Sequence, residues 1–159
     1  MIYKKSWKYI LVKDYTYYCI KNGYYRPKAL KDFSNISKGD YGGYLEGYHN
    51  LSQNGDCWVS NSAIVTGNSK VYDNAKVFHK ALIYGNTQIY ENAKVFGKAM
   101  INSTVSGNAR VFGNAKVFGN AQVSGNVVIC NNAQVYENAT IYGDVHICGN
   151  TIVKELMVK

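Results

Sequence analysis

Several cations in the chain stand two residues before an aromatic ring, and three of these pairs could together hold an anionic, planar ligand. The pairs are Lys76 with Phe78, Lys94 with Phe96, and Arg110 with Phe112. Cations attract anionic groups, and aromatic rings stack on planar ones, as in nucleotide recognition. We therefore predict these six residues to be the ligand-binding residues. The alternative for the three Phe side chains is a contact between subunits, because exposed apolar surface of this extent marks interfaces. The two interpretations are compatible.

Few other residues could do chemistry. His49, His79 and His146 are the histidines, and none belongs to a recognisable catalytic set. The four cysteines follow no C-x-x-C or Cys/His metal-binding spacing. We therefore predict no catalytic residue, no metal and no cofactor. Reduced thiols are expected, since nothing in the sequence suggests export to an oxidising compartment.

Composition limits the class of protein and of partner. Hydrophobic residues make up 47% of the 159 residues, which is ample for a core. The formal net charge of +8 favours anionic partners. No apolar run approaches the roughly 18 residues of a membrane span, and the start of the chain lacks the apolar region of a signal peptide. We expect a protein of the bacterial cytoplasm without a membrane partner.

A six-residue repeat must position these side chains. Ala109-Arg110-Val111-Phe112-Gly113-Asn114 is followed by Ala115-Lys116-Val117-Phe118-Gly119-Asn120, and the pattern runs from about Cys57 to about Thr151. The first position of each unit is small, the third is Val or Ile, and Gly-Asn often closes it. Successive side chains of a strand point to opposite faces, so the first and third positions face inward. Gly and Asn tolerate the left-handed backbone of a sharp corner.

These units predict a triangular coil. Each unit forms one short strand and one corner, three units close a coil, and stacked coils add about 4.8 Å each. The predicted fold is all-β, a parallel β-helix over residues 51–155 with a β-rich cap over 1–50 and a tail over 156–159. One outward column of this coil contains Trp58, Lys76, Lys94 and Arg110, beside a second that contains the three Phe. On another face, Ile64, Leu82 and Met100 form a further candidate packing surface.

One unit is short. Ala99-Met100-Ile101-Asn102 is followed directly by Ser103-Thr104-Val105, so two corner residues are missing. We expect a tightened corner at this point. The alternative is a local bend that shapes a pocket.

The sequence of residues 1–50 predicts strands but contains no repeat. Residues 7–12 and 15–20 are expected to be strands joined by a hairpin at Lys13-Asp14, and Asn22-Gly23 a turn into Tyr24. The first coil of a solenoid has an open edge, and covering that edge is the expected role of the segment. In the last coils, Cys130 and Cys148 share one outward column with Cα atoms expected about 5 Å apart, as stacked free thiols.

The repeats resemble the hexapeptide-repeat family, whose fold is a left-handed parallel β-helix. The resemblance implies a homotrimer with ligands in grooves between adjacent helices. The stretches 25–33, 38–46 and 50–59, including Lys38-Gly39-Asp40-Tyr41-Gly42-Gly43, resemble a leader that precedes such repeats in uncharacterised bacterial, prophage and phage proteins. Some of these are labelled acyltransferases on the repeats alone. The resemblance implies a phage or prophage setting and transfers no catalytic residue.

These observations favour a non-catalytic binding protein. It would capture an anionic small molecule such as a nucleotide signal, or block an acidic host protein, and so counter an antiviral defence; nucleic acid is not the expected partner. The first alternative is a coenzyme-A-dependent acyltransferase with His79 or His146 as its base, although no loop leaves the repeats to build an acceptor site. A γ-class carbonic anhydrase would need three zinc-binding His. The last alternative is a structural solenoid.

Overall fold

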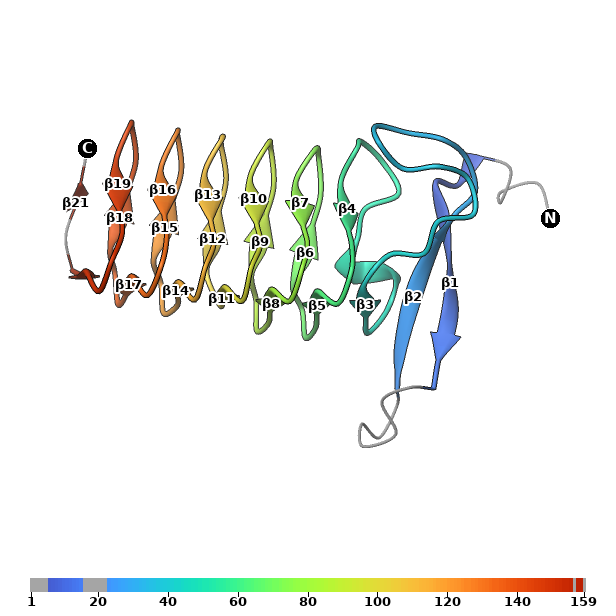
Figure 1. Ribbon diagram of the computed structural model, residues 1–159, viewed down its shortest axis with the longest axis horizontal. Coiled ribbons are helices and arrows are strands. Elements are labelled where there is room, and N and C mark those ends of the chain that lie inside the picture. The colour runs from blue at the N-terminus through green and yellow to red at the C-terminus, as the bar shows by residue number, and fades with distance from the viewer. Residues whose placement is uncertain (1–5, 16–22, 156, 159) are drawn as a thin grey trace.

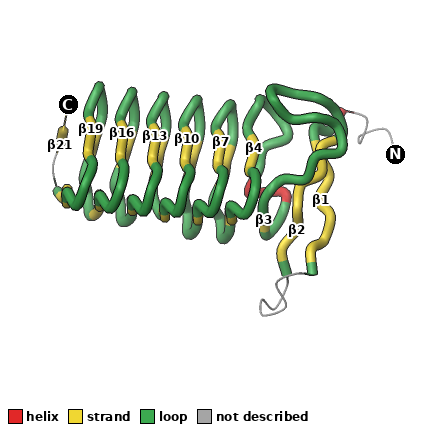
Figure 2. The backbone as a smooth tube through the Cα atoms, in the orientation of Figure 1, coloured by secondary structure: helices red, strands yellow, loops and turns green. Residues whose placement is uncertain are grey.

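The computed structural model describes residues 6–15, 23–155 and 157–158. Regular structure in these residues is almost entirely β, and the strands stack in successive parallel coils along one axis, with the N-terminal hairpin at one end (Figures 1 and 2). The coils form a left-handed triangular β-helix; the repeat predicted the triangular coil, and the family resemblance implied its hand. One short 3-10 helix, Tyr48–Asn50, precedes the first coil. No helix among the described residues is long and apolar enough to cross a membrane.

Three sheets form the sides of the triangle. The first sheet contains β4 (Trp58–Val59), β7 (Lys76–Val77), β10 (Lys94–Val95), β13 (Arg110–Val111), β16 (Val128–Ile129) and β19 (His146–Ile147). The second contains β1 (Tyr9–Asp14), β2 (Tyr24–Ala29), β3 (Tyr44–Leu45), β5 (Ile64–Val65), β8 (Leu82–Ile83), β11 (Met100–Ile101), β14 (Lys116–Val117), β17 (Gln134–Tyr136) and β20 (Ile152–Lys154). The third contains β6 (Lys70–Val71), β9 (Gln88–Ile89), β12 (Thr104–Val105), β15 (Gln122–Val123), β18 (Thr140–Ile141) and β21 (Met157–Val158).

The parallel register confirms the predicted columns. Lys94 of β10 pairs with Lys76 of β7 on one side and with Arg110 of β13 on the other. The division at residues 50 and 155 stays a prediction. Parallel pairing itself begins with Tyr44 against Ile64 and reaches Val158, which pairs with Ile141.

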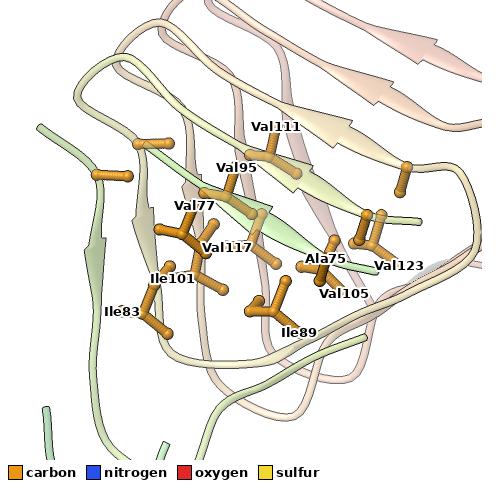
Figure 3. Packing of buried hydrophobic residues seen from close by; sticks show 14 of the residues in the cluster. Ala75, Val77, Ile83, Ile89, Val95, Ile101, Val105, Val111, Val117 and Val123 are labelled. Carbon is orange, nitrogen blue, oxygen red and sulfur yellow. The ribbon is translucent and has the colours of Figure 1, made fainter. Parts of the chain in front are cut away.

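The core is a stack of small and β-branched side chains. Ile83, Val95 and Ile101 are fully buried, and so are the Ala residues at the first position of neighbouring units, such as Ala75. Figure 3 shows these side chains converging on the axis of the helix. Each coil places its Val or Ile against the same type of residue in the next coil, so the same packing arrangement recurs along the axis.

The corners are held by asparagine. Along one corner, each side-chain amide donates to the next: Asn74 to Asn92 at 3.2 Å, Asn92 to Asn108 at 3.1 Å and Asn108 to Asn126 at 3.0 Å. Glycine allows the closest approach of the backbones at several corners. Gly97 has φ of 74°, and a Cβ there would lie 2.8 Å from the backbone nitrogen of Gly113. The Gly-Asn pairs of the sequence therefore do two separate jobs, tight turning and bonding between coils.

The short unit forms a tightened corner, as predicted. Only Asn102 and Ser103 separate β11 from β12. Thr87 and Ser103 hold the first position of their units, where Ala is usual. The buried Thr87 hydroxyl accepts a hydrogen bond from the Ser103 backbone N–H at 3.0 Å. The Ser103 hydroxyl in turn donates to the carbonyl of Ala121. The Thr87 hydroxyl thereby pairs the buried Ser103 N–H, and the Ser103 hydroxyl adds a second donor to the Ala121 carbonyl, which also accepts from the Thr104 N–H at 3.4 Å.

The cap begins with an antiparallel hairpin whose turn was placed wrongly from the sequence. Lys13 and Asp14 lie within β1 and pair with Tyr25 and Tyr24 of β2. The strand therefore continues through the predicted turn, because its alternating side chains pair with β2 over its whole length. Apart from Tyr15, the predicted strand over 15–20 lies outside the described residues, as does Asn22.

The cap covers the first coil through aromatic packing and one buried amine. The Trp58 ring meets those of Phe33 at 5.3 Å and Tyr9 at 6.0 Å between centroids. The Nζ of Lys8, which is 1% exposed, donates to the carbonyl of Cys57 at 2.9 Å and that of Gly55 at 3.1 Å. Burial lowers the pKa of Lys8, and the neighbouring Cys57 partly offsets this effect.

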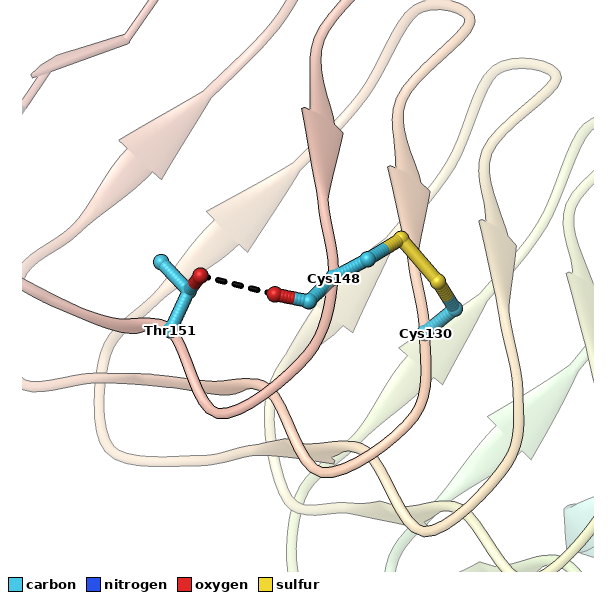
Figure 4. The surroundings of a disulfide bond; sticks show 3 residues. All are labelled: Cys130, Cys148 and Thr151. Atoms are coloured by element: carbon cyan, nitrogen blue, oxygen red, sulfur yellow. Dashed lines mark hydrogen bonds between the residues drawn. A yellow bond between two sulfur atoms is a disulfide. The ribbon is translucent and has the colours of Figure 1, made fainter.

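At the other end, Cys130 and Cys148 form a disulfide between β16 and β19, as Figure 4 shows. Their Cα atoms are 4.6 Å apart, close to the predicted spacing. The expectation of free thiols is wrong for this pair, because stacking in one column brings the two sulfur atoms into bonding range. Cys57 is free and buried.

Replacing a stacked core residue should destabilise the helix. We expect Ile83→Ala to lower the free energy of unfolding by about 2–5 kcal/mol, because neighbouring coils cannot collapse into the cavity. Denaturant unfolding followed by circular dichroism measures the change. Gln122→Ala, at an exposed position with the same backbone pairing, should change stability by less than about 0.5 kcal/mol. Equal effects of the two variants would contradict the packing argument.

Removing the disulfide should destabilise the last coils. A covalent loop between Cys130 and Cys148 is worth about 3 kcal/mol in the chain-entropy model. We expect Cys148→Ser to lower the unfolding midpoint, and a reducing agent to have the same effect on the unmodified chain but none on the variant. Intact mass before and after reduction counts the hydrogens gained. A chain that is already reduced when purified without thiols would contradict the bond.

Candidate functional site

The six residues predicted to bind a ligand lie together on the first sheet. Strands β7, β10 and β13 pair in parallel, so Lys76, Lys94 and Arg110 form one outward column. The three Phe follow their strands by one residue and form the adjacent column. The structure thus brings the whole predicted set onto one face, and ligand binding there remains a prediction.

The three Phe rings form a stacked ladder, which we call the Phe ladder (Phe78, Phe96 and Phe112). Ring centroids are 4.7 Å apart between Phe78 and Phe96 and 4.8 Å apart between Phe96 and Phe112, with planes within 5° of parallel. This spacing equals the distance between coils, which forces like side chains into register. All three rings are half-buried. The ladder is therefore rigid, aromatic and accessible from one side.

The three cations of the face differ in their environments. Lys94 and Arg110 are exposed, and the Arg110 guanidinium lies 6.0 Å from the centroid of Phe96 and 5.8 Å from that of Phe112. Lys76 is half-buried and donates to the backbone carbonyl of Asp56 and to the Ser34 hydroxyl, the latter at 3.3 Å. Burial lowers the pKa of Lys76, and the nearby Asp56 partly offsets this effect. Lys76 thus anchors the cap loop (residues 33–37) through Ser34, whereas Lys94 and Arg110 are exposed.

The predicted column begins with Trp58, which pairs in register with Lys76. The Trp58 side chain is only 1% exposed, because Tyr9 and Phe33 of the cap pack against its ring. The cap thereby converts the start of an open face into the wall of a hollow.

A hollow of about 490 Å³ opens between the cap loop and the first sheet. We call it the cap-face hollow; it is lined by Ser34, Asn35, Ile36, Trp58, Ser60, Asn61, Lys76, Phe78 and Lys94. The sequence pointed to its last three residues. It missed the loop residues 34–36, because no repeat pattern says where a cap loop folds back. Ser60 did carry a signal, since it stands at the head of the Phe column with a small side chain.

The histidines lie on separate elements. The His49 ring nitrogen is 2.9 Å from the carbonyl of Gly67, and His146 is exposed on β19. His79 occupies a corner with φ of 61°, and its ring meets the edge of Phe78 at 4.9 Å. Within the described residues, no three His, Cys, Asp or Glu side chains gather as a metal site would require.

We expect Lys76 to act as an anchor of the cap loop. Lys76→Met should raise hydrogen exchange of residues 33–37 by about fivefold, since a net hydrogen bond is worth about 1 kcal/mol. Hydrogen exchange with mass spectrometry measures this locally. The matched control is Lys94→Met, one coil further along the same column, which should leave the loop unchanged. A loop that responds equally to both variants would contradict the anchoring role.

Comparison with known proteins supports the repeat architecture. Residues 133–149, which span β17, β18 and β19, match the family model described as the YdcK beta solenoid repeat. A search of curated proteins gave no match. Strand pairing throughout the coils and this local match together identify the chain as a β-helix (β-solenoid) repeat protein.

Proposed function

We propose that the chain is a non-catalytic binding protein that captures an anionic, planar small molecule in the cap-face hollow. The proposal depends mainly on one observation: the Phe ladder ends at Phe78, next to Ser60, and both residues line the hollow. Ser60 bonds through its backbone N–H to the carbonyl of Val77, so it precedes Phe78 in the same column. Its small side chain leaves the space in front of the Phe78 ring open to the hollow. A planar group placed there would continue the stack.

The charge of the hollow favours an anion. Lys76 and Lys94 line it, and none of its described lining residues is acidic. The hydroxyls of Ser34 and Ser60 and the side-chain amides of Asn35 and Asn61 offer neutral hydrogen-bond donors. Stacking, positive charge and polar donors together match a nucleotide or a related heterocyclic anion.

The proposal includes a homotrimer, as the resemblance to hexapeptide-repeat proteins implies. Two features support self-association: the exposed part of the Phe ladder, and the half-buried column of Ile64, Leu82 and Met100 on the second sheet. Apolar surface of this extent favours contact with another protein surface. A copy packed beside the first sheet would deepen the cap-face hollow into a groove. The same surface could instead block an acidic host protein.

The biological setting of the proposal is the bacterial cytoplasm during phage infection. It rests on the resemblance of the leader (residues 25–33, 38–46 and 50–59) to that of bacterial, prophage and phage proteins. Sequestering a nucleotide signal there would counter an antiviral defence.

We expect Ser60→Phe to abolish binding, because the added ring would occupy the ligand's place in the stack. Isothermal titration against a panel of mononucleotides and cyclic dinucleotides measures the affinity. Ser124→Phe is the matched control, since Ser124 is half-buried in the same repeat position on the third sheet and lies outside the hollow. Lys94→Gln should weaken binding about fivefold, as expected for one exposed charge pair, and added salt should weaken it further.

Native mass spectrometry of gently purified protein tests the proposal without a chosen ligand. A trimer with added mass that is lost on denaturation would support capture of a small molecule. Absence of binding across the panel, together with no added mass, would overturn it. So would binding that Ser60→Phe leaves unchanged.

A further inference from the structure

The short unit interrupts one of the three asparagine ladders. At the corner between the second and third sheets, Asn68 donates to Asn86 at 3.2 Å and Asn120 donates to Asn138 at 3.2 Å. The coil between these two pairs is the one in which Asn102 is followed directly by Ser103. It therefore supplies no Gly-Asn corner between Gly85-Asn86 and Gly119-Asn120.

The interruption leaves one donor and one acceptor facing the same space. Within the described chain, the side-chain nitrogen of Asn86 has no acceptor and the side-chain oxygen of Asn120 has no donor. The backbone shows the same gap, since no described N–H donates to the carbonyl of Gly119. At the neighbouring corner, across the same coil, the ladder is continuous, with Asn92 donating to Asn108 at 3.1 Å. The missing partners thus follow from the missing residues.

A hollow of about 460 Å³ occupies this position, and we call it the corner notch. Its lining is Asn86, Asn102, Ser103, Thr104, Gly119, Asn120, Ala121 and Gln122. Four of these side chains are carboxamides and none is charged. The Asn102 side chain lies against Gly85, where a Cβ would approach its oxygen to 2.1 Å. The notch is therefore walled by amides on both sides.

The chemistry of the notch selects its ligand. A group that fits must accept from Asn86 and donate to Asn120, as the missing Asn would have done. A carboxylate could accept but would repel the Asn120 oxygen, and an ammonium could donate but would repel the Asn86 amide hydrogens. A primary carboxamide does both within one plane.

We propose that the corner notch binds a primary carboxamide, whether as a free small molecule or as the side chain of an Asn or Gln in a peptide. The site lies on a different edge of the triangle from the cap-face hollow and shares no lining residue with it. It is independent of the proposed function, and either can fail without the other.

Titration with propionamide, followed by the side-chain amide signals of Asn86 and Asn120 in ¹⁵N NMR spectra, tests the proposal. We expect saturable shifts of these signals with propionamide and none with propionate or propylamine. An acetylated and amidated glutamine that binds more tightly than propionamide would assign the site to a peptide side chain; equal affinity would assign it to a free amide. Equal shifts with propionate, or no shift at any concentration the protein tolerates, would overturn the proposal.

Two variants make the test specific. Asn120→Leu should weaken propionamide binding about tenfold, because it removes the acceptor and leaves the ligand's donor unpaired. Asn114→Leu is its control, since Asn114 also donates to the next coil, at 3.0 Å to Asn132, in a different ladder. Insertion of Gly-Asn between Asn102 and Ser103 should abolish binding by completing the corner, with circular dichroism to check folding. Binding that survives in both Asn120→Leu and the folded insertion variant would contradict the site.

Discussion

Every coil of this protein must place its side chains on those of the coil before it, and the rest of the structure depends on that constraint. Coils are separated by one strand spacing, so a residue meets its own equivalent at about 4.8 Å. Stacked Ala and Val or Ile fill most of the core, and Ala75 and Val95 are fully buried. The constraint acts outside as well, because it brings Phe78 and Phe96 into parallel contact at 4.7 Å. A surface feature repeated along the chain becomes a continuous surface.

Two hollows on this scaffold lie where the repetition stops. At the first coil the cap replaces the preceding neighbour, buries Trp58 and leaves Ser60 in front of the Phe78 ring. At the short unit, two residues are missing, so no Asn continues the ladder from Asn86 to Asn120. Both hollows form where the repeat pattern is interrupted, so that side chains that would contact an equivalent residue in the next coil lack that neighbour. Hollows of this kind inherit the chemistry of the column they interrupt, aromatic in one case and carboxamide in the other.

The disulfide shows how stacking overrides an argument from composition. Spacing alone brought Cys130 and Cys148 to the same column, and the expected Cα distance was close to the 4.6 Å observed. The expectation of free thiols came from the absence of export signals, which speaks to environment and not to geometry. The Lys13-Asp14 turn failed for a related reason: local turn propensity lost to pairing of β1 with β2 along its whole length.

The sequence by itself determined the helical part of the fold, its three faces and the register of their columns, because a six-residue period with inward Val or Ile allows one way of stacking. It also placed Lys94, Phe96 and Arg110 on one face. Only the tertiary structure decided which side chains of this face contact the cap and which remain exposed. The cap loop engages Lys76 and walls the hollow through contacts between residues far apart in the chain, and no periodicity encodes such contacts. The structure at the ends and interruptions of the repeat, where adjacent segments are not equivalent, therefore could not be predicted from the sequence.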